Sequence, residues 1–219
     1  FTFQPFNITL LNFFILPIFF ALTVYVNKKS KSTFRKKPHR KNLFTLGCFF
    51  GFGFYLSGIS WISYSLTYEE SFKFLIPFAV LFIPLFLSLF TGLTIFIVGQ
   101  FLTNNFSSIL LFSGSLALSD YLRGKVLSGF PWNVWGYSWS WFTEIVQVLN
   151  LIGLFAFNLI TITLFTIPAV LFFKDKIGKT ILILITTFTL IFSNYIYGST
   201  SINKNKGLLN YLDNDNKNY

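Results

Sequence analysis

The chain has 219 residues, of which 53% are hydrophobic and only 11% are charged, and this balance excludes a soluble globular protein with a polar surface. The net charge of +10 is concentrated, because eight of the 17 basic residues lie between Lys28 and Lys41. Such a cluster between two apolar runs is typical of a cytoplasmic loop that faces anionic lipid headgroups. We therefore expect the lipid bilayer as a partner, and no nucleic acid.

Apolar runs of about twenty residues, the length that crosses a ~30 Å hydrocarbon layer, recur along the chain. The runs are continuous and do not alternate, so they predict helices. The fold class is accordingly all-α, a polytopic membrane helix bundle with about six transmembrane helices. The predicted helices cover residues 7–26, 43–66, 72–101, 107–122, 142–173 and 180–197. Residues 1–198 would form the transmembrane domain, and residues 199–219 a polar periplasmic tail or a truncated linker.

The connections between these helices predict which side of the membrane each one faces. The basic loop, the charge-free turn 103–105 and the Lys174–Lys179 loop fall on one side, which the positive-inside rule makes cytoplasmic. The acidic connection at Glu69 and the segment 123–141 fall on the other side, together with the tail. That side would be the periplasm if the membrane is a bacterial inner membrane.

The most informative segment is residues 119–132, which reads Ser-Asp-Tyr-Leu-Arg-Gly-Lys-Val-Leu-Ser-Gly-Phe-Pro-Trp. Asp120 and Arg123 stand three residues apart at a predicted helix end, a spacing that allows an ion pair. The pair is either structural, or it leaves Arg123 to bind a lipid phosphate. Gly129-Phe130-Pro131-Trp132 predicts a turn, which is either a plain interfacial anchor or a re-entrant elbow that guides an acyl chain.

Four of the five tryptophans lie between Trp132 and Trp141, which predicts that this segment lies at the outer membrane interface.

The glycines of one predicted helix form a second pattern. Gly47, Gly51 and Gly58 share one helical face, where small residues allow close packing of a neighbouring helix. The end of this helix, at Trp61, has a second interpretation as one wall of a lipid-facing cleft.

The sequence patterns do not include a set of residues that could catalyse a reaction or bind a metal ion. Cys48 is the single cysteine and lies in an apolar helix, where a free thiol is usually a packing residue. We find no His/Cys cluster with metal-ligand spacing, no phosphate loop and no Ser-His-Asp arrangement. We therefore expect no metal, no cofactor and no catalytic residue in this chain.

Two stretches carry a family resemblance. Gly51-Phe52-Gly53-Phe54-Tyr55-Leu56-Ser57-Gly58-Ile59-Ser60-Trp61-Ile62 resembles the glycine-rich helix of bacterial apolipoprotein N-acyltransferases. The order Asp120-Tyr121-Leu122-Arg123-Gly124, Gly129-Phe130-Pro131-Trp132 and Gly136-Tyr137-Ser138 is similar to the acidic-aromatic-Leu-Arg-Gly, Gly-Phe-Pro-Trp and Gly-Tyr pattern of that family. Asp120 departs from it, since the family more often has Glu there.

The resemblance implies a reaction, and it also implies that the catalytic residues for this reaction are not in this chain. In the family, a Glu-Lys-Cys triad of a periplasmic nitrilase-like domain moves an acyl chain from a phospholipid donor to an apolipoprotein acceptor. No residue of this chain matches any of the three, so the chain would be inactive alone. Phe1–Phe6 resembles the segment that follows a first family helix, so we expect one helix before Phe1.

The sequence thus favours the membrane portion of such an enzyme. The residues expected at its lipid interface are Trp61, Arg123, Gly129, Phe130, Pro131, Trp132 and Tyr137. Two other classes remain open. A small transporter would need ionisable groups along a path through the bilayer. A non-catalytic membrane scaffold would need only the packed helices.

Overall fold

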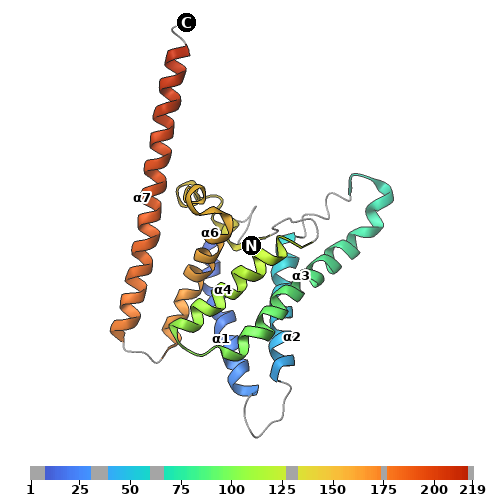
Figure 1. The fold of residues 1–219 in the computed structure, drawn as a ribbon. Helices are drawn as coiled ribbons and strands as arrows, with labels where there is room; N and C mark the ends of the chain where they lie inside the picture. Colours follow the sequence, from blue (N-terminus) through green and yellow to red (C-terminus); the bar gives the residue numbers. More distant parts are fainter. Residues whose placement is uncertain (1–7, 31–38, 60–66, 127–132, 174–176, 217–219) are drawn as a thin grey trace.

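A computed structural model describes residues 8–30, 39–59, 67–126, 133–173 and 177–216. These residues form a bundle of antiparallel helices (Figure 1). The α-helices are α1 Asn12–Ser30, α2 His39–Ile59, α3 Ile76–Val98, α4 Phe106–Arg123, α5 Thr143–Val146, α6 Leu149–Thr166 and α7 Ile177–Asn216. Short 3-10 helices adjoin them at η1 Thr9–Leu11, η3 Glu70–Leu75, η4 Gly99–Phe101, η5 Trp135–Trp139 and η6 Ile167–Phe172.

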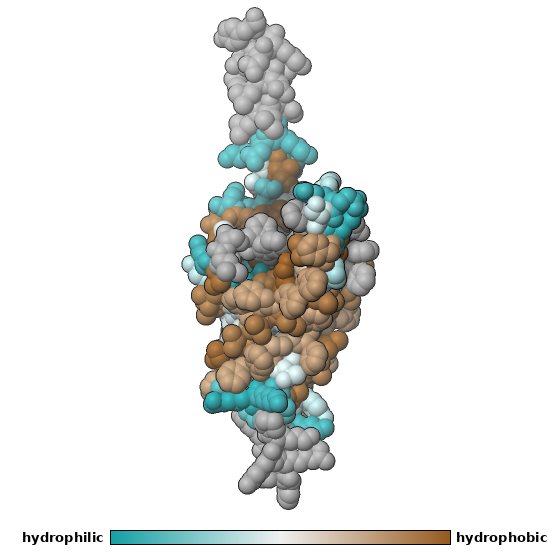
Figure 2. Space-filling view, turned by 90° about the vertical axis from the view of Figure 1, so that its right-hand side faces the viewer, coloured by the Kyte–Doolittle hydropathy of each residue, from teal (hydrophilic) through white to brown (hydrophobic). Residues whose placement is uncertain are grey.

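The all-α membrane class is confirmed. Among the described residues, five helical stretches are long and apolar enough to cross a bilayer: Thr9–Lys29, His39–Ile59, Lys73–Phe101, Leu149–Phe172 and Ile177–Gly207. The sixth predicted span, α4, forms where it was expected, but serines and the Asp120/Arg123 pair lower its hydropathy. Figure 2 shows that hydrophobic residues cover the middle of the molecule, with hydrophilic groups toward both ends.

The described ends of the helices gather at the two ends of the bundle in the two groups predicted from the sequence (Figure 1). The ends of α1, α3 and η6 and the starts of α2, α4 and α7 lie at one end of the bundle (Figure 1). The end of α4 and the helix η5 lie at the opposite end. We call this second end the outer end, following the charge distribution of the sequence.

The glycine face of α2 packs against α3, as predicted. A Cβ atom added at Gly47 would lie 2.8 Å from the Thr91 carbonyl oxygen and 2.9 Å from the Gly92 Cα. Cys48 lies over Gly92 of α3, so the thiol fills space at this interface. Gly58 faces a different neighbour, Asn133, whose backbone has a φ of 46°.

The single helix predicted over residues 142–173 is wrong. The chain forms α5, then α6 with a non-helical residue at Gly153, then η6. Gly153 has a φ of 74°, a conformation that glycine adopts without steric cost, and it breaks the helix near its start. Pro168 is the second residue of η6, and its ring removes a backbone donor and ends the α-helical pattern of α6.

The predicted end of the last helix near Tyr197 is also wrong. The helix α7 continues without interruption to Asn216 and rises beyond the rest of the bundle (Figure 1). The residues after Tyr197 include no proline, and Asn, Ser and Lys side chains are tolerated on the exposed surface of a helix. The helix therefore crosses the expected domain boundary at residue 198.

Candidate functional site

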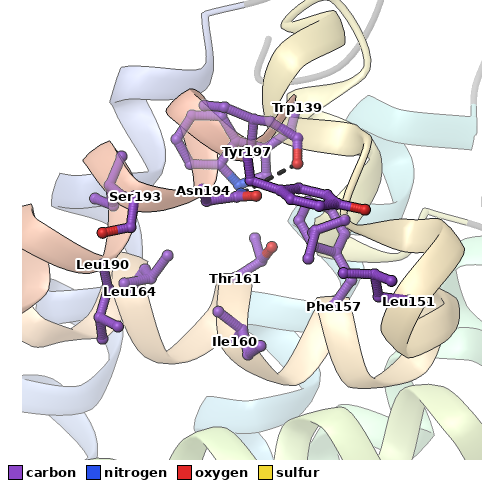
Figure 3. Close-up of a pocket in the computed structure, with 13 residues that line it drawn as sticks. Trp139, Leu151, Phe157, Ile160, Thr161, Leu164, Leu190, Ser193, Asn194 and Tyr197 are labelled. Atoms are coloured by element: carbon purple, nitrogen blue, oxygen red, sulfur yellow. Dashed lines mark hydrogen bonds between the residues drawn. The ribbon is translucent and has the colours of Figure 1, made fainter. Parts of the chain in front are cut away.

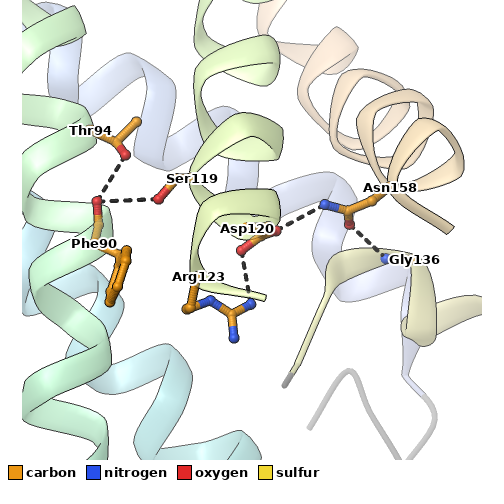
Figure 4. A network of polar contacts seen from close by, with 7 residues as sticks. All are labelled: Phe90, Thr94, Ser119, Asp120, Arg123, Gly136 and Asn158. Atoms are coloured by element: carbon orange, nitrogen blue, oxygen red, sulfur yellow. Dashed lines mark hydrogen bonds and ion pairs between the residues drawn. The ribbon is translucent and has the colours of Figure 1, made fainter. Parts of the chain in front are cut away.

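The ion pair predicted between Asp120 and Arg123 is confirmed at the outer end of α4. Arg123 Nη2 lies 3.0 Å from Asp120 Oδ1, and the two side chains are only 2% and 7% exposed, with Arg123 the more buried (Figure 4). Ion pairs this deeply buried are costly to desolvate and persist where further hydrogen bonds satisfy them.

Asn158 of α6 supplies those further hydrogen bonds. Its Nδ2 donates to Asp120 Oδ2 at 2.9 Å, and its Oδ1 accepts from the Gly136 backbone N–H at 3.0 Å. One amide thus joins α4, α6 and η5 (Figure 4). A Cβ added at Gly136 would lie 3.0 Å from Phe157 Cδ1, so glycine permits this close approach. We name the set Asp120, Arg123, Gly136 and Asn158 the outer-end network.

The role of Asn158 was not predicted from the sequence. The available signal was a lone amide in an otherwise apolar stretch, since polar residues within membrane helices commonly hydrogen-bond to a neighbouring helix. Its partners come from 22 and 38 residues away in sequence, so its role depends on the tertiary fold.

Arg123 keeps part of its hydrogen-bonding capacity. The guanidinium lies over the Tyr55 ring of α2, with 5.1 Å between its central carbon and the ring centroid. Within the described part of the chain, its Nε and Nη1 have no hydrogen-bond partner although both are buried. A guanidinium N–H donor without a protein partner is suited to an anionic oxygen ligand.

Tyr137, also predicted at the interface, lies in η5 and is 40% exposed. Burial raises the pKa of its hydroxyl, and the Arg123 charge offsets part of that rise. The phenol is therefore protonated at neutral pH and available as a hydrogen-bond donor beside Arg123. Arg123 and Tyr137 therefore interact electrostatically, and their place at a lipid interface stays a prediction.

The other predicted interface residues, Trp61 and the turn Gly129-Phe130-Pro131-Trp132, lie outside the described residues. Their roles stay predictions.

The remaining tryptophans differ from the interfacial belt that was predicted. Trp135 and Trp139 are only 4% and 5% exposed. They stack on Phe54 and Phe165, at centroid distances of 4.3 Å and 5.3 Å. Trp141 is the exposed member at 44%, and its Nε1 donates to Thr9 Oγ1 at 2.7 Å. Two of these three rings therefore anchor the segment within the protein.

A hollow of about 340 Å³ adjoins Trp135, between α1 and α2. Phe54, Gly53 and Ser57 of the glycine-rich helix line it, together with Asn12. A Cβ at Gly53 would meet nothing within 4 Å, so this glycine leaves open space and is not required by packing. Asn12 is fully buried, and its amide has no partner within the described residues. The hollow is thus lined mainly by apolar side chains, with Asn12 and Ser57 as its polar residues.

The described residues contain no group of His, Cys, Asp or Glu side chains arranged to hold a metal ion.

Comparison with known proteins shows to which protein family these residues belong. Residues 1–167 match the family model described as the apolipoprotein N-acyltransferase N-terminal domain. The chain belongs to this family. The residues that match the family model include α1 to α6 and every residue of the outer-end network. The resemblance carried by the motifs around Gly53 and Asp120 is therefore confirmed.

Individual relatives named apolipoprotein N-acyltransferase agree. The protein of Rhodopseudomonas palustris is 36% identical over 126 residues, 57% of this chain and 24% of the relative. That of Rickettsia bellii is 32% identical over 146 residues, 66% of this chain and 29% of the relative. That of Rickettsia prowazekii is 28% identical over 195 residues, 86% and 38% respectively. This chain therefore spans well under half the length of these relatives.

Proposed function

We propose that this chain is the membrane-embedded part of an apolipoprotein N-acyltransferase. The enzyme would move an acyl chain from a phospholipid to the N-terminal diacylglyceryl-cysteine of an apolipoprotein. The observation that carries the proposal is the outer-end network, in which the family-like residues Asp120, Arg123 and Gly136 meet at one buried site. That site lies at the end of the bundle expected to face the outer leaflet, where both lipid substrates would reside.

The reaction implied by the family resemblance has two balanced steps. A cysteine thiolate attacks the ester carbonyl of the phospholipid; a C–S bond forms, the C–O ester bond breaks, and the lysophospholipid oxygen leaves with the proton that the Glu base had taken from the thiol. The α-amine of the acceptor then attacks the thioester; a C–N bond forms, the C–S bond breaks, the amine proton passes to the Glu base and the thiolate is released. The nucleophile, with its Glu and Lys, would belong to a domain outside this chain, so the chain alone would be inactive.

This chain would contribute by positioning the donor lipid. Arg123 Nε or Nη1 would donate to a phosphate oxygen, and the Tyr137 hydroxyl would add a second donor. The turn Gly129-Phe130-Pro131-Trp132, with Trp61, would guide the acyl chain toward the hollow beside Trp135. Correct placement of a reacting ester can supply several kcal/mol of a reaction barrier.

The membrane is the bacterial inner membrane in this proposal, with residues 199–219 in the periplasm. We expect alkaline phosphatase, which is active only in the periplasm, to be active when fused after Tyr219 and inactive when fused within the basic loop 28–41. Inactivity of the fusion after Tyr219 would reverse the proposed topology. The extension of α7 past residue 198 is consistent with a helical connection toward a catalytic domain.

A chimera tests the function directly. Residues 1–167 of this chain replace the matching segment of the Rickettsia bellii relative, and the chimera is expressed in bacteria depleted of their own acyltransferase. We expect a reporter apolipoprotein to gain the mass of one fatty acyl group at its N-terminal cysteine. No acylation by a chimera that is present in the membrane would contradict the proposal. Ion or solute flux through liposomes containing the chain would favour the transporter alternative.

The same chimera tests the elbow. We expect Trp132→Ala to reduce acyl transfer at least about tenfold while membrane insertion is unchanged, because a misplaced substrate costs rate without affecting folding. Trp141→Ala is the matched control, since Trp141 is an exposed tryptophan outside the turn. Equal losses of transfer and of inserted protein for Trp132→Ala would argue for a merely structural anchor.

A further inference from the structure

The helix α7 is held to the bundle near its two ends. Near its inner end it adjoins η6. Near the outer end, Gly198 lies so close to α5 that an added Cβ would overlap the Glu144 carbonyl oxygen. Two hydrogen bonds support this second contact: Asn194 Nδ2 donates to the Ile145 carbonyl at 3.1 Å, and Tyr197 Oη donates to Asn150 Oδ1 at 3.2 Å.

A groove of about 380 Å³ lies between α6 and α7. Its walls are apolar: Ile160 and Leu164 come from α6, Leu190 from α7, and Trp139 closes the outer end (Figure 3). Both helices are long and apolar enough to span a bilayer, so the groove faces hydrocarbon. If the groove were empty, the side chains that line it would lose dispersion contacts. Hydrocarbon is therefore the natural occupant.

The size of the groove fits one acyl chain. A cavity of about 150 Å³ accommodates benzene, which has six carbon atoms, so a volume about two and a half times larger accommodates about fifteen carbons. This is the length of a common fatty acyl chain.

The groove also has a polar end. Thr161 is fully buried, and its hydroxyl has no partner among the described residues. This is unusual in α6, where Thr163 and Thr166 donate to the carbonyls four residues earlier, at 2.8 Å and 2.7 Å. Figure 3 shows the Thr161 hydroxyl on the side of Asn194, whose Oδ1 is likewise unpartnered, with the aliphatic side chains below.

The depth of this polar end matches the ester region of a lipid. Asn194 lies 17 residues after Ile177, the first residue of α7. At 1.5 Å per residue this is about 26 Å along the helix, close to the ~30 Å thickness of the hydrocarbon core. Thr161 and Asn194 therefore lie near the boundary where the outer-leaflet esters begin.

We propose that the groove between α6 and α7 binds one acyl chain of an outer-leaflet phospholipid, with the Thr161 hydroxyl donating to its ester carbonyl. The site is separate from the outer-end network and does not require the chain to transfer an acyl group. A lipid held there would fill the space between the two helices and fix the position of α7.

The test uses the full chain in phosphatidylcholine nanodiscs that contain a phosphatidylcholine with a photoreactive acyl chain. Labelled lipid is exchanged against excess unlabelled lipid before irradiation, and cross-linked residues are mapped by mass spectrometry. We expect labels at Ile160, Leu164 and Leu190 to survive exchange, and labels on the exposed residues Leu81 and Phe82 of α3 to disappear.

Three variants sharpen the test. Thr161→Val keeps the shape and removes the hydroxyl, so retention should fall about fivefold, the effect of one neutral hydrogen bond. Thr163→Val is the matched control and should retain the lipid. Leu190→Trp fills the groove from an exposed position and should abolish retention. The proposal is overturned if groove labels exchange as fast as those on α3, or if Thr161→Val behaves like Thr163→Val.

Discussion

Asp120→Asn is expected to lower the free energy of unfolding by about 3 kcal/mol, because it leaves a buried guanidinium without its counter-charge. Arg123 is almost fully buried, and Asp120 Oδ1 is its one hydrogen-bonding partner within the described residues. The substitution also weakens the hydrogen bond from Asn158 Nδ2. Unfolding in mixed micelles, titrated with SDS, measures the loss.

The chain provides a matched control for this change. Glu70 and Lys73 form an ion pair of the same i, i+3 spacing at the surface, with side chains 87% and 48% exposed. Glu70→Gln should change the free energy of unfolding by less than about 1 kcal/mol. If the two substitutions had equal effects, burial would not govern the Asp120–Arg123 pair. The double variant Asp120→Asn with Arg123→Met should recover part of the stability, since no unpaired charge remains.

Gly47→Val is expected to separate α2 from α3 and to cost about 3 kcal/mol or more, since overpacking against backbone is not relieved by side-chain movement. The nearest atoms to an added Cβ are the Thr91 carbonyl oxygen and the Gly92 Cα, both main-chain atoms. The contact between α2 and α3 is the most extensive between two helices of the bundle. Thermal unfolding of the purified variant in detergent reports the effect.

Gly53→Val is the control, because it lies on the same helix and an added Cβ there meets nothing within 4 Å. The intrinsic helix propensity changes equally in the two variants and cancels in the comparison. Gly53→Val should therefore leave stability almost unchanged. A Gly47→Val protein as stable as Gly53→Val would show that α2 and α3 shift apart without cost.

Features encoded locally were predictable from the sequence. The Asp120–Arg123 pair depends on one helical turn, and the glycine face of α2 depends on a single periodicity. The apolar runs predicted the helices themselves because the bilayer leaves few alternatives for the backbone.

Features that depend on distant partners were not predictable. The role of Asn158 requires α4 and η5 to meet at the same point, which no local pattern specifies. Trp135 and Trp139 have the composition of an interfacial belt, yet they are buried because Phe54 and Phe165 lie within stacking distance. The break at Gly153 was missed because glycine is tolerated within many membrane helices.

The extension of α7 has a geometric consequence. A continuous α-helix couples height to angle, since each residue adds about 1.5 Å and turns the chain by about 100°. From Gly198 to Asn216 the helix rises about 27 Å as one rod. The number of residues between Gly198 and Asn216 would thus set both the distance of a group at Asn216 from the bilayer and the direction in which that group points around the helix axis. Adding one residue would turn that group to another side of the bundle, whereas adding eighteen would return it to its original bearing, one rod length higher.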